Sequence, residues 1–247
     1  MTAWISNSCP AVVHYATGQH KELLELFGQT VVTRQHGMKD PFDPDEYEQP
    51  FISPLLLRAK RLGMEIREFK RPEFEISPAA VQFADQQAND KTIMLFPLAS
   101  RLERIWSMAY WIDLSELLLN AGFQVMTCLP SDRSLGEDFR GKKMIGMGWH
   151  FLAALMLRSR MVVCGCTGPA HVAGNLNVPC LCLSGPTARG AIYDHVPSVR
   201  QISGQIGCEG CFFQAAQGFR PACFHGCRSL NSLMPETVYD RILQNLA

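Results

Sequence analysis

Two arginines and a serine follow a short apolar segment near the middle of the chain. The apolar segment is 92–96, and Ser100, Arg101 and Arg104 come soon after it. A hydroxyl and two guanidinium groups suit paired phosphate oxygens, because each guanidinium can donate two parallel hydrogen bonds. The same residues would also suit an ordinary exposed loop. If 92–96 is a strand of a parallel sheet, the loop lies at its carboxyl end, where such sheets bind ligands.

A second segment whose residues could bind a ligand covers 161–187. Its residue order predicts a buried strand at 161–164, a glycine turn, a short helix that ends near Asn177, and a second strand at 180–183. This order is typical of half of a doubly wound sheet, in which the start of the helix faces a ligand bound at the carboxyl ends of the strands.

The glycine turn and the start of this helix form a candidate anion site. Gly165 and Gly168 allow a tight turn, Thr167 is the expected N-cap, and Pro169 suits the first helical turn. A helix N-terminus carries unpaired N–H groups and a positive partial charge, so phosphate is the ligand expected there. Glycine-rich turns also occur where nothing binds, and the dinucleotide fingerprint is not matched here.

Four of the ten cysteines form a separate pattern, C-x2-C-x11-C-x3-C. Its members are Cys208, Cys211, Cys223 and Cys227. Two closely spaced pairs can close a tetrahedron around one metal, and four thiolates suit zinc or iron. Free thiols, two disulfides, or a site in which His225 replaces one cysteine are the alternatives. A metal with four protein ligands would be structural rather than catalytic.

The elements that must position these residues alternate regularly from residue 91 onward. Strands are expected at 92–96, 123–128, 161–164, 180–183 and 199–203, and helices at 78–87, 106–120, 149–158, 168–177 and 235–246. This alternation predicts an α/β fold with a Rossmann-like parallel sheet over 89–247. Residues 1–88 give weaker signals, with short strands at 11–15 and 30–33, a helix at 54–62 and an acidic loop at 40–50. They form a predicted smaller α/β domain.

Composition bounds the class of protein. The 247 residues are 47% hydrophobic and 19% charged, with Lys+Arg 23 against Asp+Glu 23. A net charge of zero gives no general electrostatic case for binding nucleic acid or an anionic membrane. No apolar run reaches the roughly 18 residues needed to span a bilayer, and the first residues lack the features of a signal peptide. A cytoplasmic enzyme is expected.

The six cysteines outside the four-cysteine pattern lie in or beside apolar segments and are expected to be small buried hydrophobes: Cys9, Cys128, Cys164, Cys166, Cys180 and Cys182.

Three segments, taken in order, resemble the carboxyl-terminal domain of glycosyltransferase family 9, the heptosyltransferase-like family with a GT-B fold. They are 96–106, 166–171 and 185–187, and the resemblance covers roughly residues 45–247. The corresponding family motifs are a Pro-Gly-x-Ser loop with Lys-x-Trp, then Asp-x-Gly-x-x-His-x-Ala-Ala, then Gly-Pro-Thr. The resemblance implies a GT-B-like protein with a donor-binding domain at 89–247 and an abbreviated N-terminal acceptor-side domain at 1–88.

The resemblance also implies an activity, namely inverting transfer of a heptose-like sugar from a nucleotide-diphosphate donor to a glycan or protein acceptor. The donor-binding residues would be Ser100, Arg104, Thr167, Gly168, His171 and Thr187. Trp149 and His150 could face the nucleobase, although an aromatic residue at a helix start more often belongs to the core. The cysteine pattern, covering 208–227, is similar to that of autotransporter heptosyltransferases, which implies iron.

Two departures from the family pattern affect the expected chemistry. Cys166 stands where the family has an acidic residue. The family's catalytic carboxylate has no counterpart in 1–88, so the general base is unassigned. The candidates, none of which matches a family motif, are Asp40, Asp43, Asp45, His14 and His20. The alternatives are a non-catalytic nucleotide-sugar-binding or partner-dependent subunit, or a GT-B-type nucleotide-sugar epimerase. A homo-oligomer or a partner chain fits either reading.

Overall fold

The computed structural model describes most of the chain from residue 74 onward. The described residues are 14–15, 31–32, 74–130, 138–187, 192–193, 196–204, 206, 208, 210–211, 223 and 226–246. The chain divides into two compact units, Met1–Pro78 and Ala79–Ala247. In the first unit, β1 (His14–Tyr15) pairs in parallel with β2 (Val31–Val32), within the strands expected there. The helix expected at 54–62 and the acidic loop lie outside the described residues.

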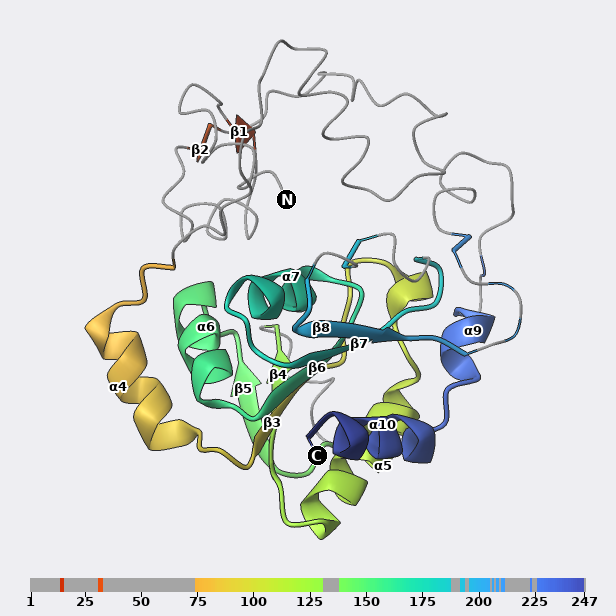
Figure 1. Cartoon of the computed structure of the whole chain (residues 1–247), viewed down its shortest axis with the longest axis horizontal. Coiled ribbons are helices and arrows are strands. Elements are labelled where there is room, and N and C mark those ends of the chain that lie inside the picture. Colours follow the sequence, from red (N-terminus) through yellow and green to blue (C-terminus); the bar gives the residue numbers. More distant parts are fainter. Residues whose placement is uncertain are drawn as a thin grey trace. The chain divides into compact units, whose positions relative to one another are not determined.

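The second unit is built on a six-stranded sheet in which all neighbouring strands pair in parallel (Figure 1). Its strands are β3 (Thr92–Phe96), β4 (Gln124–Leu129), β5 (Lys142–Ile145), β6 (Met161–Gly165), β7 (Cys180–Leu183) and β8 (Val199–Ile202). Their spatial order is β5-β4-β3-β6-β7-β8. The chain therefore builds one half of the sheet outward from β3, then returns to the centre and builds the other half from β6. The predicted α/β parallel sheet is confirmed.

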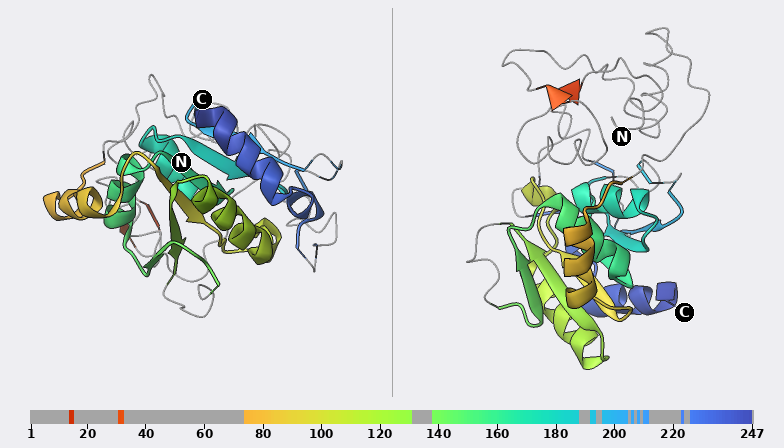
Figure 2. Two further views of the ribbon diagram at one scale, coloured as in Figure 1. Left: turned by 90° about the horizontal axis from the view of Figure 1, so that it is seen from below. Right: turned by 90° about the vertical axis from the view of Figure 1, so that its left-hand side faces the viewer.

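Helices cover both faces of this sheet. The described helices are α4 (Pro78–Gln87), α5 (Met108–Asn120), α6 (Trp149–Arg158), α7 (Gly168–Asn175), α9 (Arg228–Asn231) and α10 (Pro235–Leu246), with a short 3₁₀ turn η2 (Leu102–Arg104). Helices α5 and α10 lie side by side on one face (Figure 2). Helix α7 packs on β6, β7 and β8 and contacts α6. No helix in the described ranges is long and apolar enough to cross a membrane.

Alternate side chains along each strand divide between the two faces. On the α5 and α10 face, Ile93, Leu95 and Val163 join Trp111 and other helix residues in one buried cluster. The intervening positions face α6 and α7 and include three cysteines, all fully or nearly fully buried: Cys164, Cys180 and Cys182. With Cys128 and Cys166 also buried, the prediction of small buried hydrophobes is confirmed for these five. Cys9 lies outside the described residues.

Most expected elements have the expected bounds, and the differences have local causes. The helix expected from residue 106 begins at Met108, because Ser107 takes the N-cap position and Trp106 packs into the core. Strand β5 was not expected, since it begins with Lys142 and Lys143 and only Met144 in it is buried. Gly122, the expected stop for α5, has a positive φ of 83° that favours glycine.

Candidate functional site

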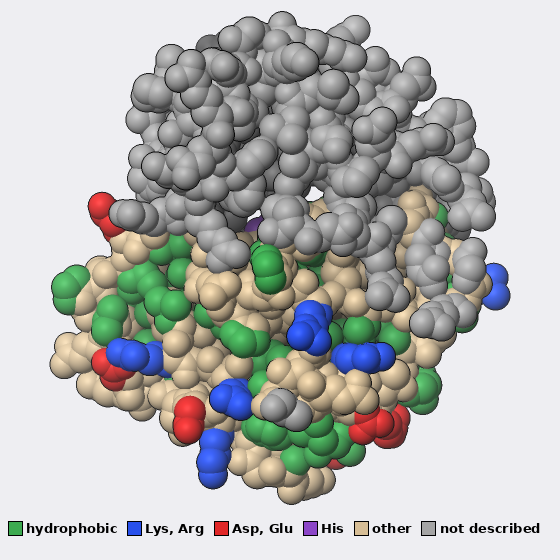
Figure 3. All heavy atoms as spheres, viewed as in Figure 1, with side chains coloured by type: hydrophobic (Ala, Val, Ile, Leu, Met, Phe, Trp, Pro, Cys, Tyr) green, Lys and Arg blue, Asp and Glu red, His purple; other side chains and the backbone are tan. Residues whose placement is uncertain are grey.

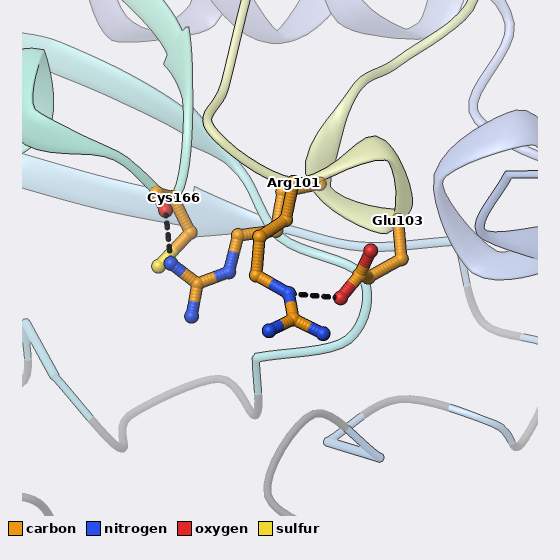
Figure 4. A network of polar contacts seen from close by, with 4 residues as sticks. Arg101, Glu103 and Cys166 are labelled. Carbon is orange, nitrogen blue, oxygen red and sulfur yellow. Dashed lines mark hydrogen bonds and ion pairs between the residues drawn. The ribbon is translucent and has the colours of Figure 1, made fainter. Parts of the chain in front are cut away.

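The strand order reverses between β3 and β6, and the loops that follow these two strands touch at that point. Open α/β sheets bind ligands outside the carboxyl ends of the strands at such a reversal. The Arg104 Nη1 donates a hydrogen bond to the backbone oxygen of Cys166 at 3.4 Å (Figure 4). A Cβ added to Gly165 would lie 3.0 Å from the backbone oxygen of Arg104. Gly165 therefore allows the close approach that brings Arg104 to the start of α7.

The loop that carries Arg104 is fixed from beneath by a buried tryptophan. Trp106 is 1% exposed, and its Nε1–H donates to the backbone oxygen of Leu233 at 3.0 Å. Its ring meets that of Trp111 edge-on, with ring centroids 5.1 Å apart. A loop anchored by an aromatic side chain and a buried hydrogen bond loses little further entropy when a ligand binds. The loop at Arg104 is therefore anchored before any ligand arrives.

Arg101 and Ser100 differ from Arg104 in their surroundings. Arg101 Nε lies 2.5 Å from Glu103 Oε1, as Figure 4 shows, and its side chain is 49% exposed. Partial burial tends to raise the pKa of Glu103, but hydrogen bonds from its own backbone and from Arg101, together with the charges of Arg101 and Arg104, lower the pKa below its usual value. Ser100 is exposed in the loop after β3. Part of the charge of Arg101 is thus matched locally by Glu103.

The start of α7 lies beside Arg104 and against a tryptophan. Thr167 occupies the N-cap position, as expected, but its hydroxyl lies 3.4 Å from the backbone oxygen of Gly165 and makes no capping hydrogen bond. Pro169 lies in the first helical turn. A Cβ added to Gly168 would lie 3.4 Å from Cη2 of Trp149, so one edge of that half-buried ring packs against the helix start. His150 follows it in α6 and is also half-buried.

Cys166 connects the helix start to the end of β7. A hydrogen bond to Cys182 and burial raise the pKa of the Cys166 thiol well above its usual 9.0, whereas Thr187 and the charge of Arg104 act to lower it. Thr187, two residues past the Gly185 turn, is fully buried. The structure therefore brings Arg104, Cys166, Thr167, Gly168 and Thr187 together at one edge of the sheet. The sequence predicted all of these as donor-binding residues except Cys166.

Sequence reasoning missed one residue of this region, Tyr193. It is 3% exposed, and its hydroxyl oxygen lies 3.3 Å from Nε2 of His171 in α7. A single tyrosine in a mixed polar segment has no neighbours at helical or strand spacing, so no pattern singles it out. Only the fold brings it to His171. The catalytic candidates Asp40, Asp43, Asp45 and His20 lie outside the described residues, and only the backbone of His14 is described, in β1.

The four-cysteine pattern lies against the same turn that carries Thr187. The backbone N–H of Gly210 donates to the backbone oxygen of Gly185 at 3.1 Å, and a Cβ on Gly185 would lie 2.6 Å from Sγ of Cys227. Burial raises the pKa of Cys227, the backbone N–H groups of Leu230 and Ser229 act to lower it, and Cys211 and Cys208 act to raise it. The thiols of Cys208 and Cys211 are therefore near enough to Cys227 to affect its pKa. Even so, the described side chains include no group of three histidine, cysteine or acidic residues gathered closely enough to hold a metal ion.

The described surface carries both signs of charge. On the face in Figure 3, Lys and Arg side chains are interspersed with Asp and Glu side chains among apolar and neutral groups. This agrees with the equal totals of basic and acidic residues in the sequence. Nucleic-acid binding relies on concentrated positive charge, which the described side chains on this face do not provide.

Comparisons with known proteins agree on one family. Residues 27–217 match glycosyltransferase family 9 (heptosyltransferase), while no curated protein sequence matches the chain. The structure is similar to the ADP-heptose lps heptosyltransferase II of E. coli, with a TM-score of 0.58 and 17% identity over 74% of this chain and 56% of that one. It is also similar to a family 9 glycosyltransferase from Veillonella parvula, with a TM-score of 0.61 and 15% identity over 91% and 65%.

A third similar structure contains a metal. It is the iron-containing dodecameric glycosyltransferase TibC of enterotoxigenic E. coli, with a TM-score of 0.62 and 13% identity over 92% of this chain and 68% of that one. TibC has also been solved in complex with ADP-D-beta-D-heptose. The chain spans 56% and 65% of the first two relatives, so it is shorter than either. These likenesses confirm the GT-B-like fold. The chain belongs to glycosyltransferase family 9 (heptosyltransferase).

Proposed function

We propose that this protein transfers a heptose-like sugar, with inversion, from a nucleotide-diphosphate donor to a glycan or protein acceptor. The observation that carries the proposal is the contact between the loop after β3 and the loop after β6, made by the Arg104 side chain and the Cys166 backbone oxygen. It supports a donor site at the reversal of strand order, where sheets of this kind bind ligands. Family membership supports glycosyl transfer as the reaction class.

The diphosphate of the donor would lie between Arg104 and the start of α7. A guanidinium can donate two parallel hydrogen bonds to phosphate oxygens. The first backbone N–H groups of α7, beginning at Gly168, would add hydrogen bonds and the positive end of the helix dipole. When the sugar departs, negative charge grows on the nucleotide diphosphate, and these groups would stabilise that charge. The hydroxyls of Thr167 and Ser100 would bind further donor oxygens.

Donor binding can be tested directly by calorimetry with ADP-, UDP- and GDP-sugars. We expect one nucleotide class to bind the wild-type chain. Replacing Arg104 with alanine should weaken that binding about ten- to a hundredfold, the worth of a hydrogen bond to a charged group. Arg104→Lys should recover part of the loss, because lysine keeps the charge without the bidentate geometry.

The matched control is Arg140→Ala. Arg140 pairs with Glu116, its side chain is 74% exposed, and it precedes β5 at the opposite, amino-terminal edge of the sheet. This variant removes the same charge from a distant place and should bind the donor as the wild type does. Equal weakening in the two variants would show a general charge effect and exclude the proposed role of Arg104. Failure of every nucleotide sugar to bind would overturn the proposed donor site itself.

We also propose that Cys208, Cys211, Cys223 and Cys227 hold one zinc or iron ion. The spacing of the four thiols and the effect of Cys208 and Cys211 on the pKa of Cys227 support this. The iron content of TibC favours iron. The ion would tie the segment 208–227 to the Gly185 turn and would not enter the reaction, since four protein ligands leave no open position.

Metal analysis of the purified full chain tests this site. We expect about one ion per chain, retained by Cys128→Ser and lost by Cys227→Ser. Cys128 is a suitable control because it is a buried cysteine of β4, outside the pattern. Visible absorbance would distinguish iron from colourless zinc. A wild-type chain that binds neither ion, even after reconstitution under reducing conditions, would contradict the proposal.

A further inference from the structure

The buried Tyr193 and the half-buried His171 form a pair beside the start of α7. Tyr193 is 3% exposed, and the two ring centroids lie 5.0 Å apart at an interplanar angle of 47°. The Tyr193 hydroxyl oxygen lies 3.3 Å from His171 Nε2. The Cys166 thiol also lies 4.0 Å from the same oxygen, as a donor. The tyrosine hydroxyl is thus enclosed between a thiol and an imidazole nitrogen.

The chemistry of the three groups fixes the direction of the hydrogen bonds. A phenol is a better donor than a thiol, and an imidazole nitrogen is a better acceptor than a sulfur atom. Burial raises the pKa of Tyr193 well above its usual 10.0, and the neighbouring cysteines raise it further, so the phenol keeps its proton. The hydroxyl of Tyr193 therefore donates to Nε2 of His171, while its oxygen accepts from Cys166.

A neutral histidine that accepts at one ring nitrogen carries its hydrogen on the other. We propose that Tyr193 is a positioning residue, which holds the ring of His171 beside the start of α7 and fixes it in the tautomer with hydrogen on Nδ1. An isolated histidine side chain prefers hydrogen on Nε2, so the protein imposes the less common form. The nitrogen of His171 that can donate a hydrogen bond is then Nδ1.

The consequence for the donor site rests on the function proposed above. His171 lies in the same helix whose start would bind the diphosphate, three residues after Gly168. A histidine with a fixed ring and a fixed donor nitrogen loses less freedom when a ligand binds than a mobile one. The tautomer itself does not depend on that function, so the two can be tested separately.

The tautomer can be read by NMR of the full chain labelled with ¹⁵N-histidine. The spectrum is recorded at about pH 8.5, two units above the ordinary pKa of histidine. His171→Gln assigns the resonances. We expect Nδ1 to resonate as a protonated, pyrrole-type nitrogen and Nε2 as a pyridine-type nitrogen. Tyr193→Phe keeps the ring contact but removes the hydroxyl, so it should move His171 towards the form with hydrogen on Nε2.

Tyr110→Phe is the matched control, because Tyr110 is a tyrosine of α5 whose ring contacts Trp106, on the other face of the sheet. It should leave the His171 resonances unchanged. Hydrogen on Nε2 in the wild type would overturn the proposal. So would a His171 tautomer that does not change in Tyr193→Phe while thermal melting shows the variant folded.

Calorimetry then tests the link to the donor site. Tyr193→Phe should weaken binding of the nucleotide sugar by roughly 3- to 10-fold, the worth of one neutral hydrogen bond. In the His171→Gln background the same change should have no further effect, because the two residues act as one unit. Equal binding by Tyr193→Phe and wild type would refute the link. If no nucleotide sugar binds the wild type, the proposed function fails, and the NMR spectra still decide the tautomer.

Discussion

Replacing Gly185 with alanine should destabilise the protein strongly, for a purely steric reason. The added Cβ would lie 2.6 Å from Sγ of Cys227 and 2.6 Å from Cγ of Leu230. Non-bonded carbon contacts are optimal at about 3.5–4.0 Å, so each neighbour would have to move by about 1 Å. Both neighbours are buried, at 2% and 1% exposed, and have little room to do so. Overpacking typically costs about 1–3 kcal/mol, and two simultaneous overlaps place this variant near 3 kcal/mol.

For a chain of this length, 1 kcal/mol changes Tm by about 2–4 °C. Gly185→Ala should therefore melt about 6–12 °C below the wild type by circular dichroism. Gly168→Ala is the matched control, since its Cβ would meet Trp149 at an ordinary 3.4 Å and should leave Tm nearly unchanged. Adding Leu230→Ala to Gly185→Ala should cost less than the sum of the two single changes, because the vacated space accepts the new methyl group. A Tm for Gly185→Ala within 2 °C of the wild type would refute the reasoning.

Two further predictions concern cysteines. Burial raises the pKa of the Cys128 thiol far above its usual 9.0. Above pH 9 the unfolded chain therefore releases a proton that the folded chain keeps. The free energy of unfolding should fall as pH rises, because the unfolded chain then binds fewer protons. Cys128 should account for a fall of about 1.4 kcal/mol in the free energy of unfolding between pH 8 and pH 10. In urea titrations the free energy of unfolding of Cys128→Ala should fall by that much less over the same range. An equal fall in both proteins would contradict the assignment. Removal of the proposed metal by a chelator should lower Tm of the wild type and leave Tm of Cys227→Ser unchanged, whereas equal shifts would indicate a non-specific effect.

Much of the second unit could be predicted from the sequence, because its central strands are buried on both faces. Strands β3 and β7 and helices α6 and α10 have the bounds that apolar runs and start signals predict. Strand β5 could not be predicted, because it is a short edge strand in which two lysines come first and only Met144 is buried. The sequence predicts a start of α5 at Trp106, two residues too early. Trp106 is buried in the loop before the helix, where it donates a hydrogen bond to the backbone oxygen of Leu233, a contact that the local sequence does not reveal.

The candidate site was only partly predictable for a similar reason. Arg104 and the glycine turn could be placed at the same edge, because parallel strands align their carboxyl ends. The contacts themselves depend on chain segments far apart in sequence. Arg104 reaches Cys166 across 62 residues, and Tyr193 reaches His171 across 22. The N-cap prediction at Thr167 gave the right position, but the hydroxyl lies near the Gly165 backbone oxygen instead of capping the helix.

The return of the chain from the sheet edge to its centre has a consequence for folding. The strands of each half, β3 to β5 and β6 to β8, are neighbours in sequence order, so each half can pair within itself. The pairing of β3 with β6 instead joins strands that the whole segment from β4 to α6 separates in sequence. Contacts between distant segments are slow to form, because the entropy of loop closure is lost before the stabilising contacts are made. The contact between Arg104 and Cys166 crosses that same seam. Competence to bind a ligand there should therefore arise late, when the two halves of the sheet join, and on a ribosome it must wait until β6 has emerged.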